Sequence, residues 1–216
     1  MNNIDLVYRI LFATEIIAFL VGVFYMRSLK RSKFILFVFY LGIIISSELL
    51  YDLLLKNNIK FQNLHIYFVI PLEFLFFHWL YYQFSTTREK RRIIVCGVIY
   101  IIAFFIERVF LNDPQKYSFS SFSYTIGNVV LLFVIFQYFI RLINSERILY
   151  FYHERLFWIS CGLLLFYLGT SPYFGLNNYL YNSYPNIFWK YVYVMYFLNC
   201  SMYLLFAASF IWGKDK

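Results

Sequence analysis

Ionisable side chains stand inside stretches of this sequence that are otherwise apolar enough to lie in lipid. The clearest case is the run from Leu64 to Trp79, LHIYFVIPLEFLFFHW, which holds His65, Glu73 and His78. Ionisable groups at membrane depth are costly, and they usually face a protein interior or a water-filled cavity. Carboxyl and imidazole groups in such a place can bind a ligand, carry a proton or hold an ion. We therefore expect this run to form one wall of a polar pocket.

Polar residues in other apolar runs fall at a similar depth. At a rise of about 1.5 Å per residue, four of them lie roughly 10–15 Å from the outer ends of their helices. They are Glu15, Glu73, Asn128 and Asn199. Glu48 reaches this level from the opposite chain direction. The candidate ligand-binding residues, in chain order, are Glu15, Glu48, His65, Tyr67, Glu73, Asn128, Tyr167 and Asn199.

Each candidate also has a purely structural interpretation. Glu15 could be a neutral, hydrogen-bonded core carboxyl, and His65 begins its run, where interfacial placement is common. Asn128 and Asn199 could form interhelical hydrogen bonds, which average about 0.6 kcal/mol in a membrane. Most of the 22 tyrosines are expected to fill the core and the interfaces. Glu73 is the hardest to explain by packing, because it lies in the middle of an apolar run beside a proline.

The composition predicts that these residues sit on membrane helices. The chain of 216 residues is 62% hydrophobic and 14% charged, whereas soluble domains are about 25% charged. A spanning helix needs about 20 mostly apolar residues. We therefore expect an all-α, polytopic membrane protein that folds as one domain of seven transmembrane helices. The expected spans are residues 6–26, 34–55, 64–84, 93–110, 122–143, 156–176 and 189–212.

Prolines indicate where these spans are interrupted. Pro71 lies in the third span, and Pro172 lies in the sixth, within the run GTSPYFG. A proline removes a backbone donor, which neighbouring helices or hydroxyl groups must replace, so we expect kinks there. The segment from Asn177 to Phe188 is rich in Asn and Tyr and contains Pro185. We expect it to be an extramembrane loop.

The distribution of Lys and Arg predicts the orientation, because cytoplasmic loops carry an excess of both. Of the 19 basic residues, 13 fall on one side of the expected spans and 6 on the other. The larger group is Arg27, Lys30, Arg31, Lys33, Arg88, Lys90, Arg91, Arg92, Arg141, Arg147, Arg155, Lys214 and Lys216. We therefore expect the N-terminus outside and the C-terminus in the cytoplasm. We expect the protein to lie in the inner membrane.

Several kinds of chemistry are excluded by the residues present. A retinal protein needs a lysine in the middle of its last helix, and the seventh span has only Lys190 at one end. Zinc hydrolysis needs clustered ligands, but His65, His78 and His153 show no such spacing. No glycine-rich phosphate loop is present. We assign no catalytic residue and no metal ligand, and we expect no cofactor.

The net charge of +8 would suggest nucleic acid in a soluble protein. Here the charges stand in the short connections between apolar runs, where they set topology. We therefore expect membrane lipid as the surroundings, and no nucleic-acid partner.

Four stretches of sequence carry a resemblance to a known family. They are HIYFVIPLEFLFF at 65–77, Asn128 in the fifth span, FWISCGLLLFYLG at 157–169 and NCSMYLLFAASFIW at 199–212. At these residues the chain resembles small seven-helix inner-membrane proteins of Bacteroidetes-type bacteria. Those proteins look like stand-alone versions of seven-transmembrane sensor input modules. The resemblance implies a signalling role and a cytoplasmic or membrane partner such as a histidine kinase.

Together these observations favour a ligand-binding or sensory module with an outward-facing polar pocket for a small molecule. Two alternatives remain open: an integral membrane enzyme that acts on lipid through its carboxylates, and a small proton-coupled transporter. A structural accessory subunit is a further option, in which the carboxyl groups would have no ligand.

Overall fold

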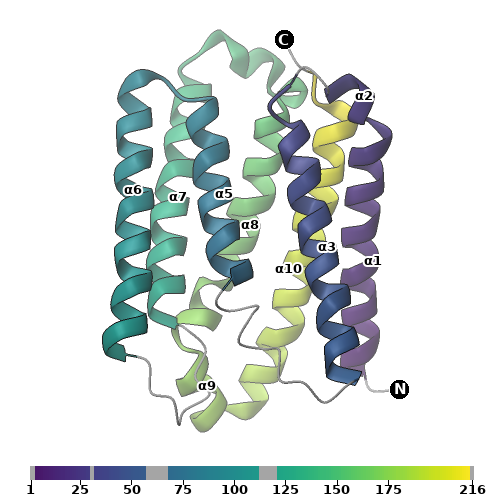
Figure 1. The fold of residues 1–216 in the computed structure, drawn as a ribbon, viewed down its shortest axis with the longest axis vertical. Coiled ribbons are helices and arrows are strands. Elements are labelled where there is room, and N and C mark those ends of the chain that lie inside the picture. The colour runs from purple at the N-terminus through teal and green to yellow at the C-terminus, as the bar shows by residue number, and fades with distance from the viewer. Residues whose placement is uncertain (1–2, 30–31, 57–67, 112–120, 215–216) are drawn as a thin grey trace.

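The computed structural model describes residues 3–29, 32–56, 68–111 and 121–214, and within them it contains helices and no strand (Figure 1). Seven of the described helices have 14 or more residues. They are α1 (Asn3–Phe24), α3 (Ile35–Lys56), α5 (Ile70–Gln83), α6 (Thr87–Ile106), α7 (Ser121–Ile143), α8 (Arg155–Gly175) and α10 (Pro185–Trp212). Short pieces join them: α2 (Met26–Leu29), the π-helical η2 (Glu107–Leu111), the 3-10 helix η3 (Glu146–His153) and α9 (Asn177–Ser183). The expectation of an all-α chain is confirmed for the described residues.

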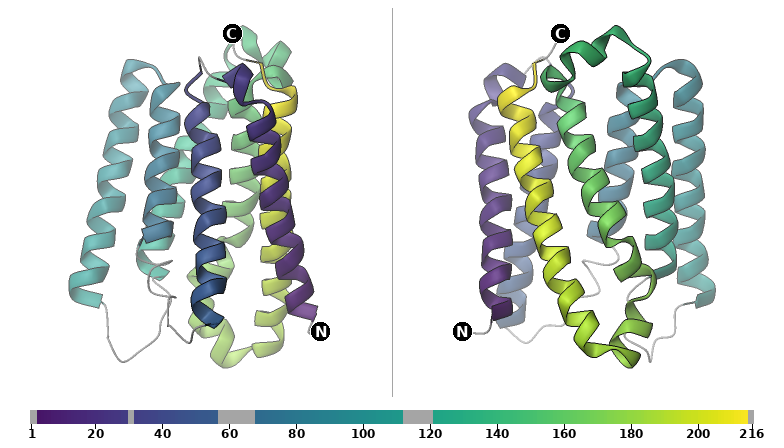
Figure 2. Two further views of the ribbon diagram at one scale, coloured as in Figure 1. Left: turned by 45° about the vertical axis from the view of Figure 1, so that its right-hand side comes forward. Right: turned by 180° about the vertical axis from the view of Figure 1, so that it is seen from behind.

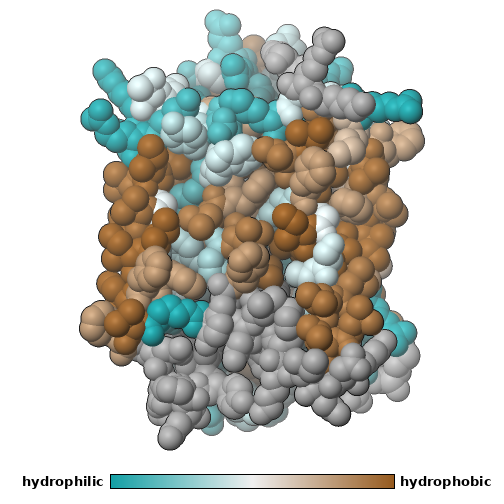
Figure 3. All heavy atoms as spheres, viewed as in Figure 1, coloured by the Kyte–Doolittle hydropathy of each residue, from teal (hydrophilic) through white to brown (hydrophobic). Residues whose placement is uncertain are grey.

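Five helical segments are long and apolar enough to cross a membrane. They are Asp5–Phe24, Thr87–Phe110, Phe122–Ile143, Arg155–Gly175 and Pro185–Trp212. Their outer faces carry large apolar side chains, and Figure 3 shows an apolar band across the middle of the molecule. The chain is therefore a multi-pass membrane protein. Helix α3 is apolar over Ile35–Tyr51 and α5 has 14 residues, so the crossing of the membrane by these two stays a prediction.

Helix α10 lies between α1 and α8, and both contacts run along much of its length (Figure 2). Helix α8 also packs on α7, α7 on α6, and α5 on both α6 and α7. Helix α3 packs on α1. Side chains join α3 and the residues just before it to α5. The rings of Tyr40 in α3 and Phe76 in α5 stack 4.4 Å apart, and Nζ of Lys33, which precedes α3, donates to Gln83 Oε1 at 2.8 Å.

Two helix boundaries differ from the expected spans. Helix α6 begins at Thr87 rather than near residue 93, because Thr86 and Glu89 form a capping box that starts the helix within its basic residues. The segment expected to be a loop, Asn177 to Phe188, is helical instead. Leu180 and Phe188 pack against α8 and α10 in a small apolar cluster, and Pro185 stands in the first turn of α10, where its missing N–H costs nothing.

The prolines stand near helix ends in the described residues. Pro71 occupies the first turn of α5. Helix α8 continues through Pro172 and ends three residues later at Gly175. Just before this proline, the hydroxyl of Ser171 donates to the Tyr167 carbonyl at 2.7 Å.

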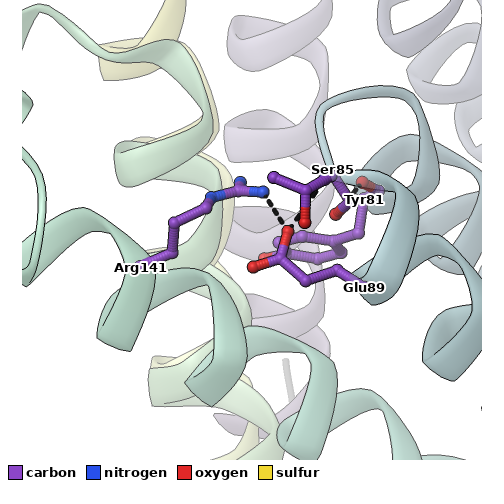
Figure 4. A network of polar contacts seen from close by, with 5 residues as sticks. Tyr81, Ser85, Glu89 and Arg141 are labelled. Carbon is purple, nitrogen blue, oxygen red and sulfur yellow. Dashed lines mark hydrogen bonds and ion pairs between the residues drawn. The ribbon is translucent and has the colours of Figure 1, made fainter.

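Polar contacts join α6 to α7 and α5 to α8 toward one end of the bundle, and Figure 4 shows the contact between α6 and α7. Arg141 of α7 donates to Glu89 of α6 at 2.6 Å. The hydroxyl of Tyr81 in α5 bonds Ser160 of α8 at 2.7 Å, and Ser85 donates to the Tyr81 carbonyl. We call this the basic end of the bundle. Its described basic residues are Arg27, Lys33, Arg88, Lys90, Arg91, Arg92, Arg141, Arg147, Arg155 and Lys214.

A glycine on α7 sets how closely α5, α6 and α7 can approach. A Cβ added at Gly127 would lie 2.8 Å from the Tyr100 ring and 3.1 Å from the Phe74 ring. We expect Gly127→Ala to lower the free energy of unfolding by about 1–3 kcal/mol, because both buried rings must shift. Gly97→Ala is the matched control, since nothing lies within 4 Å of its added Cβ. It should gain up to about 1 kcal/mol of helix stability.

SDS titration in mixed micelles measures both variants. Equal effects of the two substitutions would contradict this packing.

Candidate functional site

A cavity of about 480 Å³ lies between the helices, in the half of the bundle away from the basic end. Its described lining comes from α1, α3, α5, α7, α8, α9 and α10. It extends from Met202, near the middle of the bundle, to Tyr8, Tyr51 and Asn177 near its end. Pockets for small molecules have volumes of about 300–1,000 Å³, so this one has room for an organic ligand.

Three carboxyl groups from three different helices face the cavity. Glu15 comes from α1, Glu48 from α3 and Glu73 from the first turn of α5. The Glu15 carboxyl lies within hydrogen-bonding reach of the Glu48 carboxyl and the Tyr203 hydroxyl. Glu15 is 2% exposed, and its Oε2 has no hydrogen-bond partner within the described part of the chain. The carboxyl group of this buried residue is therefore only partly satisfied by the protein.

Two tyrosines that are not part of the described cavity lining are hydrogen-bond partners of Glu73. Tyr167 of α8 donates to Glu73 Oε1 at 2.8 Å, and Tyr40 of α3 is a second hydrogen-bond partner. Both tyrosines are buried. Near the mouth, the Tyr8 hydroxyl reaches Glu48 Oε2 at 3.5 Å. The acidic groups are thus oriented by tyrosines on helices other than their own.

A layer of aromatic rings closes the cavity toward the basic end. It consists of Phe37, Tyr40, Phe76, Phe77 and Phe206, and we call it the aromatic floor. Tyr40, Phe76, Phe77 and Phe206 stand about one turn beyond the described cavity lining, and Phe37 stands about two turns beyond it. Phe37 contacts Phe206 at 5.0 Å between ring centroids, and Tyr40 contacts Phe77 at 5.3 Å. Phe37, Phe77 and Phe206 are each 0% exposed.

The structure brings four of the eight candidate residues into the cavity wall: Glu15, Glu48, Glu73 and Asn199. Tyr167 stands behind Glu73 as its hydrogen-bond donor. His65 and Tyr67 lie outside the described residues.

Asn128 has a different place. Its Nδ2 donates to the Tyr167 carbonyl at 3.1 Å and to Ser171 Oγ at 2.8 Å, and it is not part of the described lining. Asn128 therefore forms an interhelical hydrogen bond between α7 and α8, which is the structural interpretation given for it from the sequence.

The tyrosines of the cavity wall were not singled out from the sequence. On α10, Tyr196, Asn199 and Tyr203 follow one another at spacings of three and four residues, which places them on one helical face. That spacing around Asn199 was the available signal. The partners of Glu73 had no such signal, because Tyr40 and Tyr167 come from distant helices.

Among the residues that the structure describes, no three His, Cys, Asp or Glu side chains come together as they would around a metal ion. Comparison of the chain with models of protein families, with curated proteins and with solved structures gave no match. The site is therefore interpreted from its own geometry.

The hydrogen bond to Glu73 leads to a stability prediction. Tyr167→Phe should lower the free energy of unfolding by about 1 kcal/mol, because Glu73 loses a buried donor. The matched control is Tyr138→Phe. The Tyr138 hydroxyl is buried without a partner in the described structure, so its removal should be neutral or stabilising.

Unfolding of both variants is followed in mixed micelles. A Tyr138→Phe variant that loses as much stability as Tyr167→Phe would show that the Glu73 contact contributes nothing specific.

Proposed function

We propose that the protein is a seven-span membrane module that binds a small molecule in the cavity and signals the bound state to a partner at its basic end. The observation that carries the proposal is the cavity itself. Carboxyl groups from α1, α3 and α5 face about 480 Å³ of space between the helices. Buried acids in a membrane protein usually mark a ligand or ion pathway, and here they meet in a space large enough for an organic molecule.

The basic residues support an orientation with the basic end in the cytoplasm and the N-terminus outside, in the inner membrane. Cytoplasmic connections carry the excess of Lys and Arg, and most of the described basic residues lie at the basic end. In this orientation the cavity faces the outside, and the aromatic floor separates it from the cytoplasm.

Helix α5 is the proposed route from the cavity to the basic end. Its first turn carries Glu73, and ten residues later Gln83 accepts a hydrogen bond from Lys33 of the α2–α3 connection. That distance along the helix is roughly 15 Å. Tyr81, between them, bonds α8 through Ser160. A ligand that binds Glu73 more tightly in one of two conformations of α5 favours that conformation. The contacts of Tyr81 and Gln83 then shift with the helix.

A cytoplasmic or membrane signalling partner, such as a histidine kinase, would read that shift through the basic end. Co-purification in native lipid tests this part of the proposal. A protein that binds its ligand but never associates with a partner would contradict signalling and leave ligand binding intact.

A proton-coupled carrier is the second candidate, favoured by the contact between the carboxyl groups of Glu15 and Glu48. Chains of buried acids serve as proton relays in pumps and transporters. Solute counterflow in proteoliposomes under a pH gradient separates the two candidates. Binding without flux supports the sensory module, whereas flux supports the carrier.

Cysteine accessibility tests the outward-facing cavity without knowledge of the ligand. In a background with Cys96, Cys161 and Cys200 replaced by Ala, Asn199→Cys places a thiol in the cavity wall. A membrane-impermeant methanethiosulfonate added to intact cells should modify it, because water reaches the cavity and the thiolate is the reacting species. Phe197→Cys, on the outer face of α10, is the control.

The side chain of Phe197 is 69% exposed toward the surroundings of the bundle, which are lipid in the proposed arrangement. We expect the cavity thiol to react faster than this control, because the thiolate forms in water and not in lipid. Equal rates, or reaction at Asn199→Cys only when the reagent reaches the cytoplasm, would overturn the proposed cavity or its orientation.

A further inference from the structure

We propose that the ligand of this cavity is an organic cation, an amine or a quaternary ammonium compound, held between the carboxyl groups and the aromatic walls. This inference rests on the proposed function, because it names the ligand class of the same site.

The charge of the cavity wall points to a cation. Glu15, Glu48 and Glu73 all line the cavity, and no Lys, Arg or His is found among its described lining residues. The contact between Glu15 and Glu48 needs a proton on one of the two carboxyl groups, so the described wall carries at most two negative charges and no positive one. Such a cleft concentrates cations rather than anions.

Glu15 gives a second and independent reason. It lines the cavity and is 98% buried, yet Oε2 has no hydrogen-bond partner within the described ranges. A buried polar atom without a partner carries the full cost of losing water. A cationic ligand in the cavity supplies the missing partner.

The aromatic lining fits an organic cation in particular. Six tyrosines and two phenylalanines line the described cavity. They are Tyr8, Tyr51, Tyr124, Tyr173, Tyr196, Tyr203, Phe166 and Phe174. Aromatic faces attract ammonium groups, and cages of such rings are a recurrent device for quaternary ammonium ligands.

The size of the cavity favours an organic molecule over a small inorganic ion as the occupant. The described residues contain no cluster of three acids close enough to hold one metal ion, although all three glutamates face the same space. A cavity of about 480 Å³ accommodates a molecule that reaches from the Glu15–Glu48 pair to Glu73.

Charge-selective labelling tests the inference. The Asn199→Cys variant, in the cysteine-free background, is reacted with two methanethiosulfonates, one with a trimethylammonium group and one with a sulfonate group. The ratio of their rates is divided by the same ratio for 2-mercaptoethanol in solution. We expect this normalised ratio to favour the cation by about tenfold or more.

Two further measurements use the same thiol. Glu15→Gln should lower the normalised ratio at least severalfold toward one, the value for the free thiol. Glu146→Gln changes an exposed residue at the basic end and should leave the ratio unchanged. Choline should slow the labelling, and its neutral isostere 3,3-dimethylbutan-1-ol should not. Glu48→Gln replaces Glu15→Gln if that variant does not fold, and the choline measurement needs no glutamate substitution.

Each outcome decides one point. A normalised ratio near one, with both reagents reacting, overturns the cation and leaves the open cavity of the proposed function intact. Protection by both choline and its neutral isostere also overturns the cation. Failure of both reagents to react with a folded, monodisperse variant overturns the cavity, and with it the proposed function.

Discussion

The constraint on which this structure depends is the burial of carboxyl groups inside an apolar bundle. Every such group loses water when the helices assemble, and the loss must be balanced by hydrogen bonds, by a proton or by a ligand. Glu73 is balanced by the hydroxyls of Tyr167 and Tyr40. Glu15 is balanced only in part, since its Oε2 has no partner in the described structure. Tyrosine hydroxyls therefore fix the position of Glu73 in the cavity wall, whereas Glu15 keeps an oxygen without a described partner for a ligand.

The two halves of the bundle are packed differently. Toward the basic end, the rings of the aromatic floor fill the space between α3, α5 and α10, and the contact of Arg141 with Glu89 joins α6 to α7. Toward the other end, the same helices separate and leave the cavity. The glycine at position 127 lets α7 approach the rings of Phe74 in α5 and Tyr100 in α6. Dense packing at one end can maintain the fold while the other end leaves space for a ligand.

The sequence predicted the helices and the level of the acids, because apolar runs and the rise per residue are local properties. That counting placed Glu15 and Glu73 at one depth, and both face the cavity in the structure. Pairing between distant helices was not predictable in the same way. With 22 tyrosines in the chain, nothing local selects Tyr40 as a partner of Glu73. Nor does local composition show that Phe188 packs on α8 and makes a helix of an expected loop, since that contact is tertiary.

The most direct test of the account asks which carboxyl groups share a space with a cation. Magic-angle-spinning NMR of the protein in lipid vesicles, with ¹³C-labelled glutamate carboxyl groups and ¹³C-methyl tetramethylammonium, measures this contact. The account predicts dipolar contacts from the methyl groups to Glu15, Glu48 and Glu73 together, and none to Glu146 or Glu154 at the basic end. Contacts to only one of the three, or to the glutamates of the basic end alone, would contradict a common acidic cavity.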